Sequence, residues 1–155
     1  MQVSHSNQVE SLHSCLDRRS AGVLLHVSSL PGWGTTGDLG REAHRFVDFL
    51  ATAGFGVWQT LPIGPTQADG SPYQTSSVHA GNPRLIALDP LLASGWLDGD
   101  SLPGGRLSDE EKRLALRRAW TGFQQRASVE ERHHLADFSR QQAYWLEDYC
   151  LFQAI

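Results

Sequence analysis

The chain has 155 residues, of which 40% are hydrophobic and 19% charged, and its formal net charge is −4 at pH 7. This balance is typical of a folded domain rather than a disordered chain, and the length suffices for one hydrophobic core. No stretch is rich in Lys and Arg, which argues against nucleic acid as a partner. No apolar run approaches the roughly 20 residues of a membrane-spanning helix, so no membrane partner is expected either.

The first segment of the chain, residues 1–18, is polar and shows little apolar periodicity. We expect it to be a flexible N-terminal lead-in. It lacks the apolar core of a secretory signal peptide, which predicts a cytoplasmic protein.

A strand, a helix and a second strand are predicted next. Residues 22–27 form an apolar run, as in a parallel strand that is buried on both faces. Asp38 is a suitable helix N-cap, apolar residues then recur with helical spacing as far as Leu50, and Gly54 suits the left-handed position after the helix. Residues 57–61 read as the second strand. Short connections indicate a βαβ unit with parallel strands, and in such sheets the loops after the strands build the ligand site.

A long loop, residues 62–84, begins at the end of the second strand. Its prolines exclude helix interiors and central strands, and loops of this length are usually functional or disordered. Its hydroxyl, amide and aromatic side chains, with little charge, favour an ordered structure. We therefore predict a rigid polar binding loop.

The second half of the chain is predicted to be mainly helical. Residues 85–88 read as a short strand or extended segment, and a brief helical turn follows. Ser108 and Ser128 each begin a Ser-x-x-Glu capping box, the sign of a helix start. Gly122 is expected to weaken the first of these helices by about 1 kcal/mol relative to alanine. The second is expected to run past Phe152, with its apolar stripe continuing to the end of the chain.

A glycine-rich motif, Gly32-Trp-Gly34-Thr-Thr-Gly37, matches the G-x-G-x-x-G pattern of dinucleotide-binding proteins. It follows a predicted strand and precedes a helix, as that pattern requires. However, residues 28–31 separate it from the strand, whereas the tight turn should begin where the strand ends. The second strand also lacks a carboxylate for a ribose hydroxyl. An NAD-dependent oxidoreductase is therefore the weakest of the functions considered.

Several segments, in one order along the chain, resemble a known family. They are Ala21-Gly-Val-Leu-Leu-His-Val-Ser-Ser-Leu-Pro31, Gly37-Asp-Leu-Gly40, Trp58-Gln-Thr-Leu-Pro-Ile-Gly-Pro-Thr66, Ser71-Pro-Tyr-Gln74, Ala80-Gly-Asn-Pro83 and Trp145-Leu-Glu-Asp-Tyr149. Together they closely resemble the N-terminal part of the 4-α-glucanotransferases, also called amylomaltases or disproportionating enzymes, which are related to the α-amylases.

The resemblance implies an α/β fold, a (β/α)8 TIM barrel with insertions. It implies transfer of α-1,4-glucan segments to the 4-hydroxyl of an acceptor glucan or glucose by a retaining double displacement. A complete barrel takes about 200–250 residues, so we expect an incomplete barrel here. Residues 19–88 would supply its first β/α units, and residues 89–155 an inserted helical subdomain that is truncated at its C-terminal end. In the family the catalytic carboxylates come from later strands, so no catalytic residue, metal or cofactor is assigned to this chain.

Substrate binding is the role that the resemblance leaves for the loop. It implies that Ser71 and Tyr73 line the sugar-binding cleft, while Gln74 and His79 are weaker candidates that could instead brace the loop. An aromatic face packs against a pyranose ring, and hydroxyls and amides bond sugar hydroxyls. Ala68 stands where many members carry a tyrosine that serves an accessory glucan site, so that site is in doubt.

An alternative to the fragment of a transferase is a free-standing, non-catalytic carbohydrate-binding module that reuses the loop. Such a module would fold cooperatively as a monomer and bind maltodextrin. If the chain is instead a fragment of a transferase, apolar strand edges and helix faces should be exposed in the isolated chain.

Overall fold

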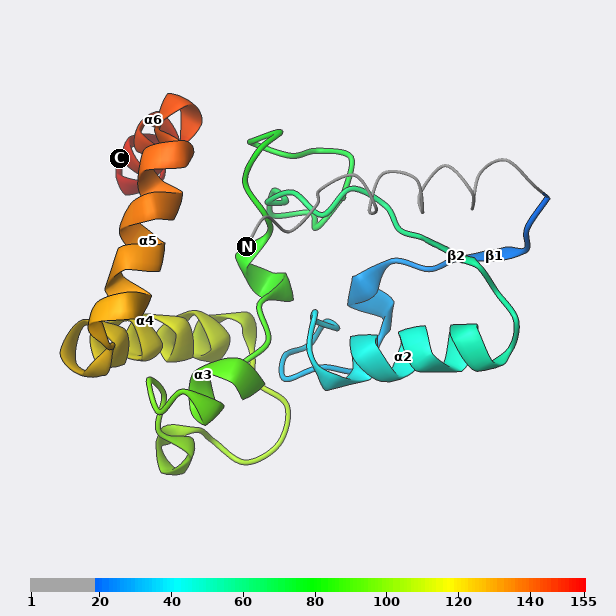
Figure 1. Ribbon diagram of the computed structural model, residues 1–155, viewed down its shortest axis with the longest axis horizontal. Coiled ribbons are helices and arrows are strands. Elements are labelled where there is room, and N and C mark those ends of the chain that lie inside the picture. Colours follow the sequence, from blue (N-terminus) through cyan, green and yellow to red (C-terminus); the bar gives the residue numbers. More distant parts are fainter. Residues whose placement is uncertain (1–18) are drawn as a thin grey trace, which may run out of the picture.

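The computed structural model describes residues 19–155 (Figure 1), so the expected lead-in, residues 1–18, lies outside the described residues. The fold is α/β, with mostly helices and a two-stranded parallel sheet. Its elements are β1 (Gly22–Leu24), α2 (Arg41–Thr52), β2 (Val57–Gln59), α3 (Asp89–Ala93), α4 (Asp109–Arg126), α5 (Val129–Gln141) and α6 (Ala143–Ala154), with short 3-10 helices η1 (Val27–Ser29), η2 (Pro83–Leu85) and η3 (Gly99–Ser101). Within residues 19–155, no helix is long and apolar enough to cross a membrane.

Strands β1 and β2 lie beside α2 on one side of the molecule (Figure 1), and they confirm the predicted parallel pair. Gly22 pairs with Val57, and Leu24 with Gln59. The prediction of a fully buried strand is wrong, because β1 ends at Leu24 and that side chain is 59% exposed. Burial on both faces requires helices on both faces, and in residues 19–155 the pair has α2 against one face, where Phe46 meets Trp58 edge to face.

Helix α2 starts later than the sequence suggested. Its N-cap is Gly40, whereas Asp38, the predicted cap, lies two residues earlier and is buried. One carboxylate oxygen of Asp38 accepts the Gly40 N–H at 3.1 Å, so Asp38 fixes the backbone of the N-cap residue instead of capping the helix itself. At the other end, Gly54 has φ +80°, which confirms the left-handed position predicted for it.

The segment after the long loop forms no strand. Asn82 accepts the Arg84 N–H at 3.0 Å and begins η2, and Ile86 beyond it has extended backbone angles. The apolar residues of this segment serve to bury side chains in the core, and they do not pair with a strand. Leu88 is completely buried in a core that also contains Leu97, Leu107, Ala115 and Ala119.

Both predicted capping boxes are present, Ser108 with Glu111 at the start of α4 and Ser128 with Glu131 at the start of α5. The single long helix predicted after Ser128 is wrong, because it breaks at Gln142 into α5 and α6. No glycine or proline marks the break. Instead the Gln142 carbonyl accepts the first N–H groups of α6, from Trp145 and Leu146 at 3.1 and 3.0 Å, and the Gln142 side-chain oxygen accepts the Trp145 indole N–H at 2.7 Å.

We expect Ser128→Ala to lower the free energy of unfolding by about 1 kcal/mol, because it removes the acceptor for the Glu131 N–H. Urea denaturation followed by circular dichroism would measure the change. Ser139→Ala is the matched control in the same helix, since its hydroxyl only bonds the Leu135 carbonyl one turn earlier. An equal loss of stability in both variants would show that the capping hydrogen bond of Ser128 does not stabilise the helix.

Candidate functional site

A pocket of about 280 Å³ lies beyond the carboxyl ends of β1 and β2, and we call it the strand-end pocket. One wall follows β1 and consists of His26, Ser28, Ser29 and Thr36. The other wall comes from the long loop and η2, through Thr66, Gly70, Pro72, Asn82, Arg84 and Leu85. The pocket therefore lies where the topology of a parallel βαβ unit places a ligand site.

His26 connects the two walls. Its Nδ1 accepts the Ser28 N–H at 3.2 Å and lies 2.6 Å from the Ser28 hydroxyl. Its Nε2 lies 3.3 Å from the carbonyl of Pro62, so the tautomer that fits carries its proton on Nε2. The first wall thus presents a fixed imidazole edge and serine hydroxyls, groups that can bond the hydroxyls of a polar ligand.

The long loop is folded upon itself. Thr66 and Thr75 form an isolated antiparallel bridge, and the Asn82 N–H donates to the Ile63 carbonyl at 2.8 Å. Gly64 permits the close packing, since a Cβ there would lie 2.4 Å from the Thr75 hydroxyl oxygen. These bonds hold the second wall of the pocket without any regular element.

Three of the predicted binding residues lie in one turn at the rim of the pocket. The Gln74 N–H donates to the Ser71 carbonyl at 3.1 Å and closes the turn. Ser71 is half-buried between Gly70 and Pro72, which both line the pocket, and Tyr73 is 72% exposed. Gln74 is exposed too. None of these three side chains lines the pocket itself.

His79, the fourth predicted residue, is not beside the other three. Its ring stacks on Trp145, with centroids 5.6 Å apart, and meets the edge of Tyr144 at 5.4 Å. Both aromatic residues belong to α6. In this structure the His79 ring therefore packs the loop against that helix.

Sequence reasoning overlooked much of the lining. Ser28 and Ser29 lie in η1, shortly after β1, and the rule that drew attention to the loop after β2 applies to them as well. Arg84 carries no comparable signal, since it follows Pro83 in an irregular segment. It is fixed by an ion pair of 2.9 Å with Asp109, at the start of α4, which is 25 positions away in the chain.

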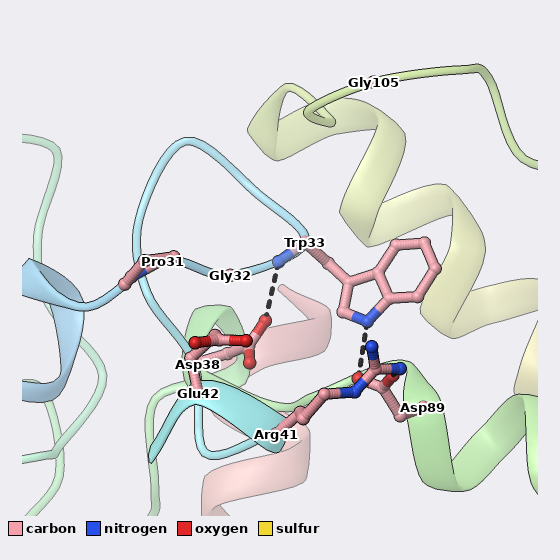
Figure 2. A pocket seen from close by; sticks show the side chains of 8 residues that line it. All are labelled: Pro31, Gly32, Trp33, Asp38, Arg41, Glu42, Asp89 and Gly105. Carbon is pink, nitrogen blue, oxygen red and sulfur yellow. Dashed lines mark hydrogen bonds and ion pairs between the residues drawn. The ribbon is translucent and has the colours of Figure 1, made fainter. Parts of the chain in front are cut away.

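The glycine-rich motif encloses a carboxylate instead of an anion site. Figure 2 shows Gly32 and Trp33 wrapped over Asp38, whose Oδ2 accepts the Trp33 N–H at 2.9 Å. A Cβ on Gly32 would come within 2.8 Å of the same oxygen. The carboxylate already takes the Trp33 N–H, a group that a bound phosphate would need, so the structure gives the dinucleotide interpretation no support.

The charge of Asp38 is balanced by Lys112 of α4, and both side chains are buried. Their Oδ2 and Nζ atoms lie 3.5 Å apart. Burial lowers the pKa of the Lys112 ammonium, while the carboxylate of Asp38 opposes that shift.

As for metals, residues 19–155 contain no group of three or more His, Cys, Asp or Glu side chains placed to hold one.

Comparisons with known proteins agree with this geometry. The family model Glyco_hydro_77, described as 4-alpha-glucanotransferase, matches residues 25–155. Over 143 residues the chain is 48% identical to the 4-alpha-glucanotransferase of Thermus thermophilus, covering 88% of this chain and 29% of that protein. Over 146 residues it is 40% identical to the 4-alpha-glucanotransferase of Aquifex aeolicus (strain VF5), with 88% and 29% covered.

Among solved structures, the chain is similar to an amylomaltase from Streptococcus agalactiae in complex with acarbose. The TM-score is 0.77 at 36% sequence identity, and the match covers 88% of this chain and 29% of that one. The chain thus spans about 29% of the length of these relatives. Residues 25–155, which the family model matches, include both walls of the strand-end pocket and the helices α2 to α6. The chain belongs to the 4-alpha-glucanotransferase family.

Proposed function

We propose that this chain is the N-terminal part of a 4-alpha-glucanotransferase that transfers α-1,4-glucan segments to the 4-hydroxyl of an acceptor glucan or glucose. The reaction is a retaining double displacement, and this chain supplies the substrate-binding loop but no catalytic carboxylate. The proposal rests mainly on the strand-end pocket. It is lined by hydroxyl, imidazole and amide groups, and it lies at the carboxyl ends of parallel strands within the matched residues 25–155.

The proposed architecture is the first part of a TIM barrel. Residues 19–88 supply β/α units of the barrel, and residues 89–155 form a helical insertion. Two observations support this division. The parallel pair β1 and β2 with α2 between them is the repeating unit of such a barrel, and α3 to α6 follow without any further strand.

The loop turn at the pocket rim is the proposed sugar contact, with Ser71, Tyr73 and Gln74 as substrate-binding residues, and His79 is the fourth residue proposed for substrate binding, away from this turn. The Tyr73 ring is exposed at the rim, where one face can stack on a pyranose ring that enters the pocket. His79 would act as a support through α6. The structural relative was solved with acarbose, which supports an α-glucan oligosaccharide as the ligand.

Maltotriose tests the proposed activity. The complete enzyme should convert it into glucose and longer maltooligosaccharides, which chromatography of the products would resolve. Hydrolysis without any longer product would contradict a transferase. Maltodextrin binding with no change in maltotriose would favour the non-catalytic carbohydrate-binding module instead.

We expect Tyr73→Ala to lower kcat/KM for maltotriose about tenfold in the complete enzyme, because the stacking face for a sugar ring is lost. Steady-state kinetics would measure it. Val78→Ala, a substitution in the same loop at a side chain that is 88% exposed, is the control and should leave kcat/KM unchanged. Unchanged kinetics in both variants would remove Tyr73 from the proposed site.

A further inference from the structure

We propose that Lys112 of α4 is a positioning residue for the strand-end pocket, because its buried side chain ties the two walls of the pocket together. This inference rests on the proposed function. Lys112 lies outside the pocket, behind its walls, and would act on the substrate only through the residues that it holds.

The ammonium of Lys112 contacts the second wall and the segment that continues the chain after the first wall. Its Nζ donates to the Arg84 carbonyl at 2.6 Å, and Arg84 lines the pocket beside Leu85. The same Nζ lies 3.5 Å from Asp38, two residues after Thr36 on the opposite wall. Because Lys112 is only 3% exposed, water competes little for either interaction.

Asp38 can pass this restraint to the first wall, because the N–H of the preceding residue, Gly37, donates to the Ser28 carbonyl at 2.9 Å. Its two carboxylate oxygens accept the N–H groups of Trp33 and Gly40, at 2.9 and 3.1 Å (Figure 2 shows the first). Next to it, the Leu39 N–H donates to the Leu85 carbonyl at 2.9 Å, a direct backbone bond from the segment of Asp38 to the second wall. A shift of Lys112 would therefore loosen both walls at once.

Helix α4 holds Arg84 at two points. The Arg84 carbonyl bonds Lys112, and its guanidinium pairs with Asp109 in the first turn of the same helix at 2.9 Å. Gly34 lets the lysine side chain pass, since a Cβ there would lie 3.3 Å from the Lys112 Cδ. A buried charge pair is costly and is weak evidence for stability alone. A role in fixing the pocket geometry accounts for the charged pair at this place.

Lys112→Met in the complete enzyme tests the inference, since it keeps most of the side-chain volume and removes the charge. We expect KM for maltotriose to rise about tenfold, as for the loss of a charged hydrogen bond, with kcat within about threefold of wild type. Hydrogen exchange at the Leu39 amide should become at least about tenfold faster, while the Leu50 amide at the far end of α2 is unchanged. Arg117→Met, an exposed position of α4, is the control and should change neither quantity.

A lower melting temperature with wild-type KM and wild-type exchange at Leu39 would show a merely structural role and overturn the inference. If the methionine variant does not fold, Lys112→Arg takes its place. It keeps a charge beside Asp38 but cannot place a nitrogen at the same point near the Arg84 carbonyl, so KM should again rise, and a wild-type KM would contradict us. If the wild-type enzyme has no transfer activity, the proposed function fails, and the Leu39 exchange still decides whether Lys112 holds the walls.

Discussion

Replacing Gly122 with alanine should destabilise the protein by about 3 kcal/mol, although alanine is the better helix former. Gly122 lies in α4 where the segment after α3 crosses it, and a Cβ there would come within 1.8 Å of the Trp96 carbonyl oxygen. That oxygen also accepts a hydrogen bond from the Arg126 guanidinium at 2.9 Å. The added methyl group would displace backbone and break this bond. Urea denaturation of both proteins would give the difference.

Thr121→Ala is the matched control for this experiment. Thr121 precedes Gly122, is exposed, and its hydroxyl only bonds the Arg117 carbonyl within the helix at 3.2 Å. Alanine at position 121 should leave stability the same or raise it slightly, as helix propensity alone predicts. A stabilising effect of alanine at both positions would mean that the close contact with Trp96 does not exist in solution.

Gly122 shows why part of this fold escapes sequence analysis. Its helix propensity predicts a weak point, yet the reason for a glycine is a backbone from another segment, which no local pattern reveals. Asp38 is a similar case. Its position before a helix suggests a cap, whereas its charge is matched by Lys112, 74 positions away. Contacts of this separation depend on the tertiary fold, so local reasoning assigns such residues the wrong role.

Features that depend on neighbouring residues were predictable. The two Ser-x-x-Glu boxes bond within four residues, and both occur where the sequence places them. Gly54 ends its helix for a reason of local backbone sterics, and the parallel strand pair follows from the short connections. The break at Gln142 was not predictable in the same way, because no glycine, proline or capping side chain marks it in the sequence.

The same distinction between local and tertiary features applies to the candidate site. The long loop could be recognised from its prolines, its length and its position after β2. Which of its side chains face the pocket depends on how the loop folds back, through contacts such as the one between Thr66 and Thr75. The wall after β1 runs from His26 to Thr36. The rule that identified the loop after β2 applies to it as well, but which of its side chains face the pocket depends on the tertiary fold.

Removing the carboxylate of Asp38 should have the largest effect on stability. Asp38→Ala leaves the Lys112 ammonium buried without its counter-charge and takes the acceptor from the N–H groups of Trp33 and Gly40. Breaking one side of a buried pair costs about 3–5 kcal/mol, so we expect a loss in that range by urea denaturation. Asp48→Ala, at an exposed position of α2, is the control and should change stability by less than about 0.5 kcal/mol.

The double variant Asp38→Ala/Lys112→Met shows whether the loss arises from the unpaired charge. Removing both partners eliminates the buried charge, so the double variant should be more stable than the sum of the two single losses predicts, by at least about 1 kcal/mol. Additive losses would mean that Asp38 acts only through the two backbone N–H groups. The ion pair would then not hold α4 to the loop before α2, and the positioning role of Lys112 would have to rest on the Arg84 carbonyl alone.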